Sequence, residues 1–134
     1  MTSKVTYLGN LRTTATHLAS GKKLITDAPV DNQGKGEAFS PTDTLATALA
    51  SCLITIMGIK AHDLGINIEG TFAEVNKIMG VQPRRVTEIK VKVCFLSSLG
   101  AKTKKILEKA ALTCPVANSL HPNLKQSITF IWPS

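Results

Sequence analysis

The longest apolar pattern in the chain runs from Ser40 to Ile59, and it predicts a helix that is buried on every side. No charged residue occurs from Thr44 to Ile59, and Ala, Leu, Ile and Met recur on every face of a helical projection, as is typical of a core helix. Ser40, Pro41 and Asp43 fit the N-cap, first and third positions of a helix start. The uncharged run is shorter than the about 20 residues that a membrane-spanning helix needs.

Alternation of apolar and polar residues predicts strands on both sides of this helix. Three short strands form an N-terminal β-meander, and a long loop, 27–39, leads from it to the helix. The predicted ranges are strands 3–9, 11–19 and 22–26, helix 41–64 ended by Gly65, strands 66–79 and 85–97, helices 100–113 and 116–120, and strand 126–132. The order β-β-β-α-β-β-α-α-β predicts a single α+β domain, 1–134, with the central helix packed on an antiparallel sheet.

Composition and charge indicate an ordinary globular protein. Hydrophobic residues make up 43% of the chain and charged residues 19%, which is close to the average for such proteins. The net charge of +7 could indicate a nucleic-acid partner, but the basic residues are dispersed and only six aromatic residues could stack on bases. We expect a solvated basic surface with no nucleic-acid or membrane partner, and a salt-dependent shift on DNA or RNA would be needed to revive that alternative. The N-terminus has no apolar signal segment, so we expect a cytoplasmic protein with reduced thiols.

Three cysteines are the candidate reactive groups. A free cysteine is usually a small buried hydrophobe, and Cys94, in a predicted strand, fits that role. Cys114 precedes Pro115 and falls at the N-cap of the next helical segment, where the helix dipole and free backbone N–H groups lower the pKa of a thiol. Cys52 lies in the middle of the apolar helix, where burial makes a thiol inert unless a cation or a hydrogen-bond donor reaches it.

Other kinds of site find little support in the sequence. The chain has no C-x-x-C or H-x-x-x-H pattern, and His17, His62 and His121 are scattered, so no metal site is predicted. The glycines of loop 27–39 do not form a phosphate-binding pattern. A Cys–His nucleophile pair stays open, although nothing specific supports it.

Two segments carry a resemblance to a known family. Residues 39–52 read FSPTDTLATALASC and residues 114–120 read CPVANSL; together they resemble the OsmC/Ohr family of osmotically inducible and organic hydroperoxide resistance proteins. The resemblance extends over essentially the whole chain. It implies an OsmC-like fold and an intertwined homodimer with two long central helices and active sites at the dimer interface.

The resemblance also implies a chemistry. Active members are thiol-dependent peroxidases, in which Cys52 matches the peroxidatic cysteine, Cys114 the resolving cysteine and Arg12 an arginine that holds the thiolate and polarises the peroxide. A lipophilic organic hydroperoxide would be reduced to an alcohol, leaving a Cys52 sulfenic acid that Cys114 converts to a disulfide. An external dithiol would restore the thiols, with no metal or bound organic cofactor.

One element of the family pattern is absent. The family has a glutamate directly after the helix-opening proline, whereas this chain has Thr42 there and Asp43 one place later. Asp43 either caps the helix or serves as the active-site acid; an ideal helix separates it from Cys52 by roughly 13 Å, so contact would need an irregular first turn or a partner chain. The alternative function is therefore a non-catalytic OsmC-like dimer that binds a small apolar ligand or has a structural role in a stress response.

Overall fold

The computed structural model describes residues 1–134 and contains two compact units, Met1–Leu45 and Ala46–Ser134. The elements are β1 (Ser3–Gly9), β2 (Arg12–His17), β3 (Lys23–Asp27), the 3-10 helix η1 (Val30–Asn32), α1 (Pro41–Asp63), β4 (Phe72–Gly80), β5 (Arg85–Cys94), α2 (Ala101–Ala111), α3 (Pro115–Ser119) and β6 (Lys125–Ile131). The predicted α+β order is confirmed, and η1 adds a short turn to the predicted loop.

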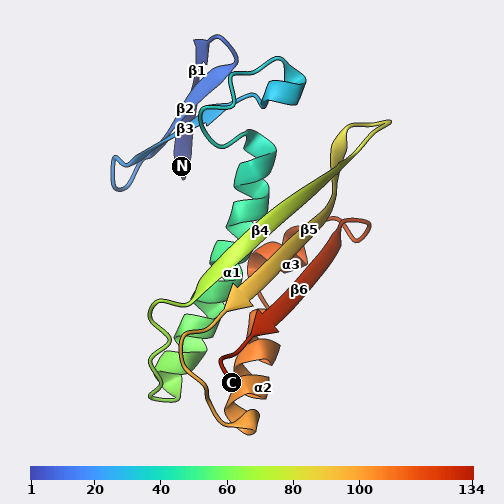
Figure 1. Ribbon diagram of the computed structural model, residues 1–134. Coiled ribbons are helices and arrows are strands. Elements are labelled where there is room, and N and C mark those ends of the chain that lie inside the picture. The colour runs from blue at the N-terminus through green and yellow to red at the C-terminus, as the bar shows by residue number, and fades with distance from the viewer. The chain divides into compact units, whose positions relative to one another are not determined.

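The first unit is built on the predicted β-meander, an antiparallel sheet in the order β1-β2-β3 (Figure 1). Asn10 and Leu11 both have positive φ, 55° and 61°, as a tight hairpin turn requires of its central residues. In the β2–β3 register Arg12 lies opposite Asp27. The loop that follows β3 is closed at its base, because the N–H of Asp27 donates to the carbonyl of Phe39 at 3.0 Å.

Local capping signals define both ends of α1. The N–H of Asp43 donates to Ser40 Oγ at 3.0 Å, and the N–H of Ser40 donates to Asp43 Oδ2 at 3.0 Å. This reciprocal pair is the predicted capping box. At the other end Gly65 has a φ of 69°, and the N–H of Ile66 reaches back to the carbonyl of Ala61 at 2.8 Å, as expected for a glycine just beyond a helix.

The second unit packs helices on one face of the sheet β4-β5-β6 (Figure 1). Its core draws on α1, on the central strand β5 and on α2. The largest buried apolar side chains are Leu49, Leu53, Met57, Ile89, Val91, Val93 and Leu107. On β5 the buried residues alternate with exposed ones, because successive side chains of a strand point to opposite faces.

The structure corrects the predicted sheet in three respects. The sheet is mixed, because β5 pairs antiparallel with β4 but parallel with β6; α2 and α3 form the crossover that parallel neighbours need. The strand predicted from Ile66 begins only at Phe72. Asn67 Oδ1 accepts the N–H of Glu69 at 2.8 Å, and Gly70 has a φ of 91°, so the chain turns there instead of extending. The strand predicted to reach residue 97 ends at Cys94.

The prediction that α1 is buried on every side is wrong for the single chain. Side chains such as Leu49 and Leu53 are fully buried, whereas Leu45 and Ile59 are 37% and 57% exposed. The composition of α1 shows that each of its faces is apolar, but it does not show which parts of the chain cover each face. With 23 residues α1 is also long and apolar enough to cross a membrane, by length and composition alone, a test that core helices of soluble proteins pass as well.

Candidate active site

The structure brings Cys52 and Cys114 together in the second unit. Both are free thiols. Cys52 lies mid-helix on α1, is partly buried and packs against the core, to which the fully buried Cys114 belongs. Burial raises the pKa of the Cys114 thiol most, and the nearby Cys52 thiol raises it further. The two thiols therefore lie near each other.

Cys114 occupies the predicted N-cap of α3, but the predicted lowering of its pKa is wrong. Its Sγ accepts the N–H of Ala117 at 3.3 Å, and Pro115 is the first helical residue. The N–H groups of Ala117 and Val116 do lower the thiol pKa, yet burial raises it by more and Cys52 adds to the increase. Cys114 is therefore held as a neutral thiol.

Arg12 is held in the first unit by two carboxylates. Its Nε donates to Asp27 Oδ1 at 2.7 Å and its Nη2 to Asp27 Oδ2 at 2.9 Å, while Nη2 also donates to Glu37 Oε1 at 3.2 Å. The hydrogen bond from Arg12 lowers the pKa of Asp27 although burial opposes it, and the same bond raises the pKa of Arg12. The pair is a bidentate fork of two ionised groups.

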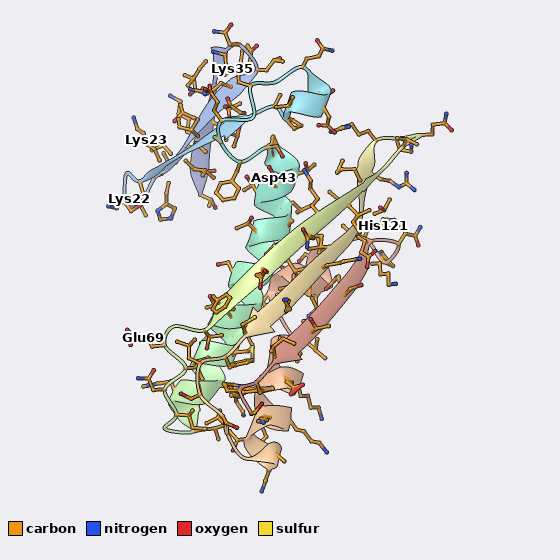
Figure 2. The ribbon with its side chains drawn as sticks, in the orientation of Figure 1. Lys22, Lys23, Lys35, Asp43, Glu69 and His121 are labelled. Carbon is orange, nitrogen blue, oxygen red and sulfur yellow. The ribbon has the colours of Figure 1, made fainter.

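Asp43 lies at the first turn of α1 (Figure 2). Its Oδ2 accepts the N–H of Ser40, so its predicted capping role is confirmed. Arg12, Thr42 and Asp43 all belong to the first unit, whereas both cysteines belong to the second. The roles of Arg12 and Asp43 toward Cys52 stay predictions.

Asp27 and Glu37 are the residues that the sequence analysis missed. Both fell in the predicted loop 27–39, whereas Asp27 is the last residue of β3 and pairs with Arg12, the first residue of β2. Extending the predicted third strand by one residue would have placed a carboxylate directly across from the arginine. A cross-strand pair of opposite charges was the available signal.

A mostly apolar cavity of about 440 Å³ lies between α1 and α2 in the second unit. It is lined by Ile56, Ile59, Lys60, Asp63, Ile106, Lys109, Ala110 and Thr113. Ile56 follows Cys52 by four residues and so shares its face of α1, and Thr113 directly precedes Cys114. The lining thus includes one residue on the Cys52 face of α1 and one that adjoins Cys114 in the sequence.

The remaining candidates add no further site. Cys94 ends β5, in register with Phe72 and Ile131. No group of three or more His, Cys, Asp or Glu side chains is arranged to hold a metal ion.

Comparisons with known proteins agree on the family. The family model described as OsmC-like protein matches residues 34–129. A protein from Psychrobacter arcticus 273-4, whose name proposes an osmotic-stress-induced, detoxification-response role, has 60% identity and a TM-score of 0.94 over 97% of this chain and 95% of its own. No curated protein matches the chain.

Two more distant structures share the fold. An organic hydroperoxide resistance protein OsmC from Legionella pneumophila has 17% identity and a TM-score of 0.76, with 96% of this chain and 94% of its own covered. An organic hydroperoxide resistance protein from Elizabethkingia anophelis has 14% identity and a TM-score of 0.76, with 99% and 97% covered. The resemblance carried by residues 39–52 and 114–120 is confirmed, and because the family model spans more than half of the chain, the chain belongs to the OsmC-like protein family.

Proposed function

We propose that this protein is a thiol-dependent peroxidase that reduces organic hydroperoxides. The observation that carries the proposal is the neighbouring pair of free thiols, Cys52 and Cys114, one partly accessible and the other buried as a neutral thiol. The names of the Legionella pneumophila and Elizabethkingia anophelis proteins and the detoxification role proposed for the Psychrobacter arcticus protein are compatible with this reaction.

Cys52 carries out the first step. Its thiolate attacks one oxygen of the hydroperoxide, the O–O bond breaks, and the alkoxide leaves and takes a proton to become the alcohol. The sulfur loses two electrons and becomes a sulfenic acid. In this proposal Arg12 stabilises the thiolate and donates an N–H to the departing oxygen.

Cys114 carries out the second step. Burial, above all, and the nearby Cys52 both raise the pKa of the Cys114 thiol, which keeps it protonated while Cys52 reacts. A Cys52 sulfenic acid is neutral, so the repulsion disappears, while the N–H groups of Val116 and Ala117 still stabilise a Cys114 thiolate. That thiolate attacks the Cys52 sulfur and releases hydroxide, which takes a proton to form water. An external dithiol then reduces the disulfide.

The cavity between α1 and α2 supports a lipophilic substrate. Its lining includes Ile56, Ile59 and Ile106, together with Thr113, which directly precedes Cys114 in the chain. An alkyl or aryl group could occupy this space while its peroxide reaches Cys52. Hydrogen peroxide would leave the apolar surface uncovered and gain nothing from it.

We also propose that the active form is a homodimer. The exposed face of α1, with Leu45 and Ile59, is too apolar to be an ordinary solvated face, and the family resemblance implies two central helices in one dimer. Sedimentation or light scattering at working concentration tests this, and a monomeric active enzyme would contradict it.

Consumption of cumene hydroperoxide in the presence of a dithiol tests the proposed activity. We expect turnover by the wild type and by Cys94→Ser, which removes a thiol distant in sequence from both segments of the site. We expect none by Cys52→Ser and a single oxidation of Cys52 without a disulfide in Cys114→Ser. Equal activity of the wild type and Cys52→Ser would refute the proposal.

A specific observation favours one alternative, a non-catalytic protein that binds a small apolar ligand. Thr42 stands where the family has its glutamate, and the cavity is mostly apolar. Mild treatment with an organic hydroperoxide followed by mass spectrometry separates the two functions. Failure to form a Cys52–Cys114 disulfide supports the alternative.

A further inference from the structure

In the proposed peroxidase function, on which the following assignment rests, an acid must orient Arg12. The family resemblance implies a glutamate after the helix-opening proline, and this chain has Thr42 at that position. Asp43, the next residue, is engaged in the capping box with Ser40. The start of α1 therefore offers no carboxylate that is free of a structural task.

Asp27 has the placement that an orienting acid needs. It is 1% exposed and lies directly across the sheet from Arg12. Its Oδ1 accepts a hydrogen bond from Arg12 Nε at 2.7 Å, and its Oδ2 accepts one from Arg12 Nη2 at 2.9 Å. Its Oδ2 also accepts the N–H of Glu37 at 3.1 Å, which fixes the carboxylate plane. Lys35, in the same loop (Figure 2), adds a favourable charge. A buried carboxylate with these bonds has one orientation, and its two parallel hydrogen bonds fix the orientation of the guanidinium as well.

The fork also determines which end of Arg12 is available. A guanidinium has five N–H donors. Nε gives its one hydrogen to Asp27, and Nη2 gives its two to Asp27 and Glu37. The two N–H groups of Nη1 have no partner among these bonds, so Nη1 is the end that remains for a ligand. Arg12 itself is about one-third exposed, so that end can be reached.

We propose that Asp27, in place of an acid at the start of α1, is the positioning residue for Arg12 in the peroxide reaction, and that it leaves Nη1 as the end of the guanidinium that serves the reaction. Asp27 acts only through Arg12 and touches no substrate. Glu37 is 63% exposed and holds the guanidinium by one longer bond, so it contributes far less.

The test measures the second-order rate constant for oxidation of Cys52 by cumene hydroperoxide in a single turnover, in the full-length protein. Asp27→Asn preserves the size of the side chain but replaces one acceptor oxygen with a donor, which breaks the fork. We expect the rate constant to fall about 10- to 100-fold, the cost of an angstrom-scale misplacement of a catalytic group. The matched control Glu37→Gln keeps an acceptor oxygen at an exposed position, and we expect a change of no more than about five-fold.

A double-mutant cycle separates positioning from a purely structural effect. If Asp27 acts through Arg12, Asp27→Asn adds little further loss in an Arg12→Lys background, because lysine cannot be held in a bidentate fork. If Asp27 serves only the fold, the two losses multiply, and the proposal is overturned. Restoration of part of the rate by Asp27→Glu is the expected behaviour of a positioning carboxylate.

The remaining outcomes are equally decisive. A wild-type rate in a folded Asp27→Asn variant overturns this proposal and leaves the peroxidase function intact. If Asp27→Asn does not fold, Asp27→Glu decides alone: a wild-type rate overturns the proposed positioning, and a loss in the wild-type background that disappears in the Arg12→Lys background supports it. A wild type that consumes no hydroperoxide overturns the proposed function itself.

Discussion

Formation of the Cys52–Cys114 disulfide should make the protein measurably harder to unfold. The two cysteines are neighbours in the core of the second unit, but roughly 60 residues separate them along the chain. A cross-link restricts the unfolded chain more than the folded one, by an amount that grows with the logarithm of the loop length. For a loop of about 60 residues the chain-entropy relation gives about 4 kcal/mol at 25 °C.

Equilibrium unfolding in urea measures this difference. The oxidised sample receives one equivalent of organic hydroperoxide, and the reduced sample is kept in a phosphine reductant at the same protein concentration. With a slope of about 2 kcal/mol per molar urea, the midpoint should rise by about 2 M on oxidation. Cys94→Ser should retain the shift, and Cys114→Ser should abolish it.

Two results would refute the reasoning. If mass spectrometry finds no disulfide in the oxidised wild type, the sulfur atoms are not positioned for the resolving step. If the disulfide forms but the midpoint does not rise, closing it strains the native state by about as much as it restricts the unfolded chain, and the two cysteines are not set for a low-strain bond.

Four further perturbations follow from the structure. Ser40→Ala removes the acceptor for a backbone N–H of the first turn of α1 and should cost about 1 kcal/mol in thermal unfolding; an unchanged melting temperature would contradict the capping geometry. Because the pKa of Asp27 is lowered in the folded state, its contribution to stability is present above the ordinary carboxyl pKa of about 3.9 and is lost as the pH falls through the lower folded value. Urea unfolding between about pH 5 and 2 should therefore depend less on pH in Asp27→Asn, and identical pH profiles would argue against the pair. Cys114, buried and with a raised pKa, should react with iodoacetamide at pH 8 more slowly than Cys94 in the native protein but not in urea, as peptide mass spectrometry would report; equal native rates would exclude its burial. Ala110→Phe fills the cavity between α1 and α2 and should slow reduction of cumene hydroperoxide about 10-fold relative to hydrogen peroxide, whereas an equal loss with both would show that the cavity does not hold the substrate.

The elements that the sequence predicted well are those with local causes. Ser40 and Asp43 bond to each other, and Gly65 supplies its own positive φ, so the ends of α1 depend on a few adjacent residues. The N-cap position of Cys114 follows in the same way from Pro115. These signals are complete within one helical turn and can be read without knowing the fold.

The candidate site was predicted in part. The resemblance identified Cys52 and Cys114, and their proximity agrees with it. The pKa of Cys114 was predicted in the wrong direction, because the N-cap is a local feature whereas burial comes from distant elements such as α1 and α2. The carboxylates on Arg12 were missed because strand register, which pairs Asp27 with Arg12, is a property of two strands together.

By itself the sequence determined the order of the elements, the limits of the central helix and the two cysteines that resemble a peroxidase pair. Only the tertiary structure decided that β6 runs parallel to β5 and that one face of α1 stays exposed. It also decided that Cys114 is held as a neutral thiol and that Asp27 forms an ion pair with Arg12. The physical reason is the range of the interactions. Caps and turns act between residues a few positions apart, whereas strand direction, desolvation and a buried ion pair depend on segments that only folding brings together.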